Sequence, residues 1–175
     1  MATNKDTGCV DSSGALSFRF AVREDAPLIH RMVADLSAFL GESEKHQASI
    51  ADYERYGFGD KPKFECVIAE HGSEAVGMCL FFDSFSTWIG RPGVYVQDLY
   101  VSDKVRGLGL GKKLLAHVAS IGQARGCAYL RLSVDADNVS AQKFYESCSL
   151  QWSSSEKVYA VRNEAFFALA ALDAK

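Results

Sequence analysis

Short apolar runs, each bounded by polar residues or glycine, predict six strands along the chain. They cover residues 17–22, 64–70, 74–87, 93–101, 128–134 and 155–161. The second and third runs are separated only by His-Gly-Ser at 71–73, and glycine suits a tight turn. We therefore expect these two strands to form a hairpin.

Five further segments predict helices, at 24–40, 48–58, 112–126, 138–148 and 163–174. Pro27 lies within the first turn of the first helix, a position that proline tolerates. Apolar residues recur in this helix at Leu28, Met32, Val33, Leu36 and Leu40. The expected apolar face of the third helix consists of Leu114, Leu115, Val118, Ala119 and Ile121.

The order of these elements predicts a mixed sheet within one layered domain. From residue 93 onward the order is strand, glycine turn, helix, strand, helix and strand, whereas the earlier strands suit an antiparallel meander. We expect an α+β (α/β layered) fold over residues 18–175 and a flexible tail over the polar residues 1–17. A chain of 175 residues is long enough for one such domain with its own core.

Composition narrows the classes of partner. The formal net charge is −3, which lacks the basic excess of nucleic-acid-binding domains, so we expect no nucleic-acid partner. A mildly acidic protein suits a cationic small molecule, although simple solubility explains the charge equally well. No apolar run approaches the ~20 residues of a membrane span, and residues 1–17 lack the apolar core of a signal peptide. We expect a cytoplasmic protein with no membrane partner.

The cysteines and histidines do not suggest a metal site. The five cysteines are scattered and contain no Cys-x-x-Cys pair, which argues against a disulfide framework and suits a reducing cytosol. Cys66 and Cys79 lie in apolar runs, so we expect them in the core. The four histidines show no ligand spacing, and we expect no metal.

The glycine turn Arg106–Gly111, with the sequence Arg-Gly-Leu-Gly-Leu-Gly, is the most informative motif. A dinucleotide fingerprint would need glycine in place of Lys112, and a nucleoside-triphosphate loop would need glycine in place of Arg106. A glycine turn at a helix start still directs backbone N–H groups outward at the positive end of the helix dipole, which suits a pyrophosphate. On spacing alone, a glycine-rich connector with surface lysines explains the turn equally well.

The turn resembles the R/Q-x-x-G-x-G/A motif of the GNAT superfamily of acetyl-CoA-dependent N-acetyltransferases. Residues 138–145 match the Asn-x-x-Ala-x-x-Phe-Tyr segment that follows it. Residues 56–70, 88–101 and 143–150 are similar to segments of the spermidine/spermine (diamine) acetyltransferases and their thialysine-acetylating relatives. The resemblance covers about residues 18–172. It implies the GNAT fold, a twisted, mostly antiparallel mixed sheet that is flanked by helices and splays in its middle to hold acetyl-CoA. It also implies a homodimer.

The resemblance also implies which residues hold acetyl-CoA. Seven backbone N–H groups would bind the pyrophosphate, those of Arg106, Gly107, Leu108, Gly109, Leu110, Gly111 and Lys112. Main-chain groups of Leu99, Tyr100 and Val101 would pair with the pantetheine arm, and the Leu99 N–H would donate to the oxyanion. Asn138 would contact CoA, with capping of its own helix as the alternative.

Two side chains are candidates for proton transfer. Tyr145 matches the family tyrosine proposed to protonate the CoA sulfur, with a core tyrosine as the alternative. Diamine acetyltransferases carry Glu-Asp where this chain has Gln97 and Asp98, so a glutamate base is absent. Asp98 could attract the substrate ammonium and relay its proton through water, or it could be a structural hydrogen-bonding residue. Neighbouring strand residues point to opposite faces, so only a bulge would bring Gln97 and Asp98 to one site.

Three further residues are candidates for the substrate pocket. Glu42 and Glu44 fall near acidic residues of the diamine enzymes and could bind a distal ammonium, with a solvated acidic loop as the alternative. Trp88 could line the amine channel or pack at a dimer edge. The resulting hypothesis is an acetyl-CoA-dependent N-acetyltransferase for a diamine, polyamine or lysine-like amino acid. A catalytically weak acyl-CoA-binding regulatory module and a protein-amine acetyltransferase are the alternatives.

Overall fold

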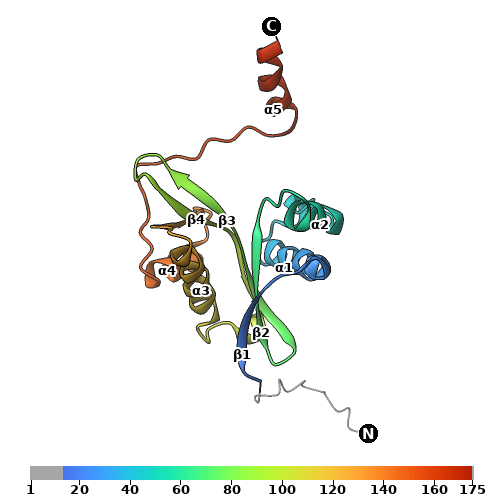
Figure 1. Cartoon of the computed structure of the whole chain (residues 1–175), viewed down its shortest axis with the longest axis vertical. Coiled ribbons are helices and arrows are strands. Elements are labelled where there is room, and N and C mark those ends of the chain that lie inside the picture. The colour runs from blue at the N-terminus through green and yellow to red at the C-terminus, as the bar shows by residue number, and fades with distance from the viewer. Residues whose placement is uncertain (1–13, 175) are drawn as a thin grey trace. The chain divides into compact units, whose positions relative to one another are not determined.

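The computed structural model describes residues 14–174, which form two units, residues 14–133 and 134–174. The first unit contains one sheet with the strand order β1-β2-β3-β4-β5 (Figure 1). Its strands are β1 (Leu16–Phe20), β2 (Glu65–His71), β3 (Glu74–Ser86), β4 (Arg91–Val101) and β5 (Leu130–Leu132). The first four pair antiparallel and β5 pairs parallel to β4, which confirms the predicted mixed, mostly antiparallel sheet.

Helices cover both faces of this sheet (Figure 1). On one face lie α1 (Ala26–Phe39) and α2 (Ile50–Phe58), with the short helices η1 (Arg23–Asp25) and η2 (Ser43–Lys45) beside α1. On the other lies α3 (Leu110–Ala124), which follows η3 (Asp103–Val105). The α1–α2 core is a cluster of buried residues: Ala26, Ile29, Met32, Tyr53, Cys66, Ile68, Met78, Leu80 and Tyr100.

Residues that alternate with this cluster along β2 and β3 face α3, because successive strand side chains point to opposite faces. They include Val67, Cys79 and Phe81, which are all fully buried. The expectation that Cys66 and Cys79 lie in the core is therefore confirmed. The sheet is buried on both faces at its centre, which makes β3 and β4 a rigid support for whatever lies at their ends.

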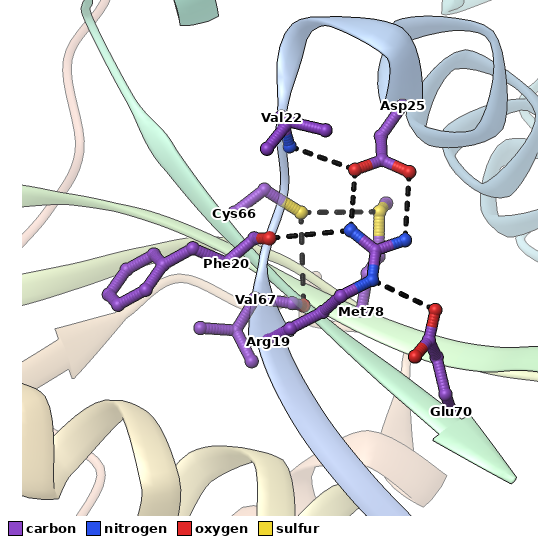
Figure 2. A network of polar contacts seen from close by, with 8 residues as sticks. All are labelled: Arg19, Phe20, Val22, Asp25, Cys66, Val67, Glu70 and Met78. Carbon is purple, nitrogen blue, oxygen red and sulfur yellow. Dashed lines mark hydrogen bonds and ion pairs between the residues drawn. The ribbon is translucent and has the colours of Figure 1, made fainter.

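Arg19 fastens β1 to the start of α1 (Figure 2). Its guanidinium donates two hydrogen bonds to Asp25, at 2.6 and 2.9 Å, and a third to Glu70 on β2 at 2.9 Å. Asp25 also accepts the Val22 N–H, and the Arg19 hydrogen bonds hold the pKa of Asp25 below its ordinary value. Paired planar contacts of this kind fix both distance and direction, so the network sets where α1 leaves the sheet.

The second unit contains α4 (Val139–Ser147), α5 (Asn163–Ala170) and η4 (Ala171–Ala174). The predicted strand at 155–161 is wrong, because these residues have no strand assignment and lie outside the five-stranded sheet. Val158 and Tyr159 are 84% and 89% exposed. An apolar run becomes a strand only when a neighbouring strand takes up its backbone N–H and C=O groups, and sequence pattern alone cannot reveal that partner.

Several predicted boundaries shift by a few residues. The helix predicted at 24–40 begins as η1 and becomes α-helical at Ala26, whereas α3 begins at Leu110, two residues earlier than predicted. Ala119 is exposed, and the buried face of α3 instead includes Leu110 and Gly122. Residues 1–13 of the predicted tail lie outside the described residues, and β1 begins at Leu16. Across residues 14–174, no helix has both the length and the apolar character needed to cross a membrane.

Candidate active site

A bulge interrupts β4 at the point where the candidate residues lie. Leu80 on β3 is opposite Asp98, but the next β3 residue, Phe81, is opposite Val96. Gln97 is therefore an extra residue without a partner on β3. A bulge of this kind bends the strand and redirects the side chains beside it. Sequence alternation required a bulge here if the Gln97 and Asp98 side chains were to reach one site. Gln97 is exposed.

Beyond the bulge, one edge of β4 has no partner strand among the described residues. The pairing between β4 and β5 runs from Val94 to Val96 and then ends. The Ser102 N–H donates to the Val76 carbonyl, 2.9 Å away, and hydrogen-bonded pairs alternate along an antiparallel ladder. It follows that the N–H groups of Leu99 and Val101 point away from β3, toward the free edge. An extended ligand could add to this edge as a further strand.

The glycine turn provides a second set of outward N–H groups. Gly107 and Gly109 have φ values of 80° and 79°, which non-glycine residues rarely adopt. Gly109 is the N-cap of α3, so the N–H groups of Leu110, Gly111 and Lys112 in the first turn have no helical acceptor. A Cβ atom built on Gly107 or Gly109 would meet nothing within 4 Å. The turn therefore offers an open, positively polarised surface.

Arg106 connects this turn to the β4 edge. Its Nε donates to the Val101 carbonyl at 2.9 Å, and its guanidinium lies 4.0 Å from the centre of the Phe39 ring at the end of α1. The side chain therefore holds the turn against β4 and α1. Lys112 and Lys113 are exposed at the start of α3 and add positive charge there.

Asp98 lies on the α1–α2 face of the sheet, because it shares its face with its partner Leu80. Its side chain is partly buried, and this burial raises the pKa of Asp98 to about 6. A carboxyl with such a pKa holds a proton more readily than an exposed aspartate and still ionises below neutral pH. It is suited to taking a proton from an amine and releasing it again.

The three other predicted pocket residues lie in two connecting segments, one around η2 and one between β3 and β4. Glu42 forms an ion pair with Lys45, and Glu44 is exposed in η2, which favours the solvated acidic loop. Trp88 is 98% exposed in the turn between β3 and β4. Because strands rise about 3.3 Å per residue, this turn lies roughly 20 Å from Asp98 along β4. The amine-channel role of Trp88 therefore has no support within one chain.

Asn138 and Tyr145 both belong to α4 in the second unit. The Asn138 side chain accepts the Ala141 N–H at 3.0 Å, so it caps α4 in the way the sequence offered as the alternative to CoA contact. Tyr145 is partly buried, with its ring 5.2 Å from that of Phe144. The proton-donor role of Tyr145 stays a prediction from the motif.

Sequence reasoning did not identify an aromatic cluster on the α1–α2 side of Asp98. It contains His30 from α1, His46 from the loop after η2, and Tyr53 from α2. The His46 Nε2 and Tyr53 hydroxyl atoms lie 3.3 Å apart, and the His30 and His46 ring centres lie 4.9 Å apart. Fifteen residues lie between the two histidines, so no local spacing could signal their contact. The described residues contain no group of three His, Cys, Asp or Glu side chains that could hold a metal ion.

The arrangement fits the two polar parts of acetyl-CoA. The outward N–H groups of the glycine turn and of α3 suit the pyrophosphate, and the free edge of β4 suits the amide groups of the pantetheine arm. The Arg106 contact with Val101 joins these two surfaces. A long ligand that carries both groups could therefore follow one continuous path across β4 and the turn.

Several known proteins are similar to this chain in sequence or in fold. Thialysine N-epsilon-acetyltransferase of Mus musculus is 36% identical over 143 residues, which cover 76% of this chain and 82% of the mouse protein. Spermidine/spermine N(1)-acetyltransferase-like protein 1 of Homo sapiens is 30% identical over 136 residues, which cover 74% of this chain and 19% of the human protein. An integron cassette protein from the mobile metagenome of V. cholerae has a TM-score of 0.76 at 21% identity, covering 89% of this chain and 97% of its own, which shows a common fold.

A family profile shows to which family the chain belongs. The profile of the Acetyltransferase (GNAT) family matches residues 29–149, a span that includes the β4 bulge, the glycine turn and α4. The resemblance inferred from the sequence motifs is therefore confirmed. The chain belongs to the GNAT family of acetyltransferases and is an N-acetyltransferase that uses acetyl-CoA.

Proposed function

We propose that this enzyme transfers acetyl directly to the terminal amine of a lysine-like amino acid, with diamines and polyamines as weaker substrates. The observation that carries the proposal is the position of Asp98 beside the free edge of β4. It puts a proton-accepting carboxyl next to outward main-chain N–H groups. The similarity to thialysine N-epsilon-acetyltransferase supports an amino-acid substrate of this kind.

Binding of acetyl-CoA would use the two surfaces joined by Arg106. The N–H groups of Gly107, Gly109, Leu110, Gly111 and Lys112 would hold the pyrophosphate, aided by the positive end of the α3 dipole and by the Lys112 charge. The predicted N–H groups of Arg106 and Leu108 instead donate to the carbonyls of Asp103 and Val105, each at 3.4 Å. The main-chain groups of Leu99 and Val101 would pair with the pantetheine arm. Acetyl-CoA supplies an activated thioester, which the protein would hold against the amine.

Asp98 and Leu99 would act on the two reacting groups. The substrate arrives as an ammonium ion, which Asp98 attracts and from which it accepts a proton. The neutral amine can then attack the thioester carbonyl. The Leu99 N–H, directed to the free edge, would donate a hydrogen bond to the oxyanion that forms.

Tyr145 would complete the reaction by donating its phenolic proton to the departing sulfur, and it would regain a proton from the nitrogen of the tetrahedral intermediate, which must lose one to become an amide. A phenol can protonate a thiolate as the carbon–sulfur bond breaks. Support for this role comes from the match of residues 138–145 to the family segment. The capping of α4 by Asn138 stabilises the start of the helix that carries Tyr145.

Gln97 is the reason for ranking a lysine-like substrate above a polyamine. A neutral amide at the bulge leaves Asp98 as the carboxylate of this pair, so the site attracts a polycation less strongly than Glu-Asp would. An amino acid carries one side-chain ammonium and a carboxylate, so it depends less on a second acidic group. The exposure of Gln97 is consistent with a role at the mouth of the amine site.

A homodimer and a cytoplasmic location complete the proposal. The homodimer is supported by the subfamily resemblance of residues 56–70 and 88–101, and by the exposed apolar side chains of Trp88 and Ile89. The location is supported by the scattered cysteines, of which Cys66 and Cys79 are buried free thiols.

The test is release of CoA from acetyl-CoA by the purified chain, with thialysine, lysine, ornithine, putrescine, spermidine and a lysine-containing peptide offered separately. We expect the largest kcat/KM with thialysine or lysine, and an N-acetylated product by mass spectrometry. CoA release that no amine stimulates, together with retained acetyl-CoA binding, would support the regulatory module instead. A preference for the peptide would support a protein-amine acetyltransferase.

A further inference from the structure

The aromatic cluster on the Asp98 side of the sheet contains a polar contact between Tyr53 and His46 that the proposed acetyl transfer does not use. Tyr53 is 8% exposed and belongs to the same core cluster as Leu80, the partner of Asp98. The Tyr53 hydroxyl contacts His46 Nε2 at 3.3 Å. His46 is only partly buried, so the Tyr53–His46 contact joins a buried hydroxyl to a side chain that reaches solvent.

Tyr53 packs in the same core cluster as Leu80, the residue opposite Asp98 on the same face of the sheet. Burial raises the pKa of Tyr53 to about 12, and the negative charge of Asp98 contributes to this rise. The hydroxyl therefore keeps its proton in the resting enzyme and is available as a hydrogen-bond donor. Toward a neutral His46 Nε2 the hydroxyl donates, and toward a protonated Nε2 it accepts, so this contact can pass a proton.

We propose that Tyr53 and His46 conduct to solvent the proton that Asp98 takes from the substrate amine. This inference rests on the proposed function, because it concerns the proton released by that amine. An N–H bond of the ammonium breaks as an O–H bond forms on Asp98. Asp98 then gives its proton, through water, to the Tyr53 oxygen while the Tyr53 hydroxyl proton moves to His46 Nε2. His46 finally releases a proton to bulk water, which restores every group.

The groups around this route favour transfer toward His46. Asp98 is faced by Tyr53 from α2 and Cys66 from β2, and burial raises the pKa of the Cys66 thiol, so this thiol does not compete for the proton. His46 is faced by His30 from α1 and Tyr53 from α2, and its own loop carries Glu42, Glu44 and Lys45. An imidazole can accept a proton on one ring nitrogen and release one from the other, as the exit of such a route requires.

The proposal makes Tyr53 and His46 positioning residues that act through Asp98, and the pH profile separates this role from simple packing. In the full chain, His46→Gln keeps a polar side chain but cannot carry a proton. Tyr53→Phe keeps the ring packed against Phe64, with which it makes an edge contact, and removes the hydroxyl. His71→Gln at the end of β2 is the matched control.

We expect His46→Gln and Tyr53→Phe each to lower kcat/KM for the amine about 10–100-fold near pH 7. The loss should disappear near pH 10, where much of a lysine-like amine is already neutral. Acetyl-CoA affinity and the unfolding midpoint of Tyr53→Phe should stay within about twofold and a few degrees of wild type. Added imidazole should restore part of the activity of His46→Ala near pH 7, and His71→Gln should behave as wild type.

The proposal is overturned if Tyr53→Phe keeps wild-type kcat/KM near pH 7, or if the loss in either variant is the same at every pH. Imidazole that fails to increase the activity of His46→Ala also contradicts it. If His46→Gln does not fold, Tyr53→Phe carries the same test. Activity of the wild-type protein toward small amines is measured alongside. Its absence would contradict the proposed function, whereas its presence with unaffected variants would contradict only the relay.

Discussion

Asp98 and Leu99 are neighbours on β4, yet the side chain of one and the main-chain N–H of the other serve two different sides of the strand. Asp98 is opposite Leu80 and faces the α1–α2 core, whereas the Leu99 N–H points along the sheet to the edge that β5 leaves free. The bulge at Gln97 lies immediately before both. Two adjacent residues of one strand can therefore supply a proton acceptor for the amine and a hydrogen-bond donor for the thioester.

The burial of Asp98 should reduce the stability of the folded protein at neutral pH. Its folded-state pKa of about 6 lies above the ordinary value, so ionisation costs folding free energy as pH rises through this range. Asp98→Asn should therefore increase the free energy of unfolding near pH 7.5 by about 1–3 kcal/mol, and this gain should vanish below about pH 4. Urea unfolding at both pH values checks the expectation, with the exposed Asp60→Asn as a control that should change neither. A variant less stable than wild type near pH 7.5 would contradict it.

The glycine turn should lose affinity for CoA when it gains a negative charge. Gly109→Asp and Gly109→Asn place side chains of nearly equal size at the same positive φ, so both bear similar backbone strain. Only the aspartate repels the pyrophosphate. We expect Gly109→Asp to raise the Kd for CoA about 10-fold more than Gly109→Asn does, as measured by calorimetry. Equal affinities of the two variants would mean that the pyrophosphate binds elsewhere.

Tyr145→Phe should slow the chemical step and leave CoA binding intact. Removing the proton donor should lower kcat about 100-fold, because the thiolate then departs without general-acid assistance. The Kd for CoA should remain within about twofold of wild type, because the ring is preserved. Steady-state kinetics and calorimetry measure the two quantities. Tyr159→Phe, at a side chain that is 89% exposed, is the matched control, and an unchanged kcat for Tyr145→Phe would remove Tyr145 as the acid.

Gln97→Glu should shift the preference toward polyamines. A second carboxylate beside Asp98 attracts a polycation, so kcat/KM for spermidine should rise about 10-fold relative to that for lysine. The added charge should also raise the pKa of Asp98 further and move the acid limb of the pH profile upward. Competition between the two amines measures the preference directly. An unchanged ratio would show that the residue at the bulge does not select the substrate.

Much of the fold was predictable because its signals are local. The apolar runs gave the hairpin of β2 and β3, and the glycine turn marked the start of α3 to within two residues. The family resemblance implied main-chain binding at Leu99 and Gly109, which stays a prediction. Such N–H groups depend on strand ends and helix starts rather than on side-chain packing.

The unpredicted features depend on contacts between distant segments. The bulge that places Asp98 arises from the register between β3 and β4, and alternation within β4 alone contains no trace of it. His30, His46 and Tyr53 meet only because α1 and α2 pack on the same face of the sheet. The segment 155–161 has the composition of a strand, but the partner that would pair with it is not encoded in that composition.

The most direct test of the account is the pH dependence of kcat/KM for amine-dependent CoA release by wild type and Asp98→Asn. We predict that wild-type kcat/KM toward thialysine or lysine rises through an acid limb near pH 6, as Asp98 ionises. In Asp98→Asn that limb should be lost and kcat/KM near pH 7 should fall about 100-fold or more, with acetyl-CoA affinity unchanged. Equal activity of the two proteins near pH 7, or an acid limb that persists in the variant, would contradict the assignment of Asp98 as the group that takes the proton from the amine.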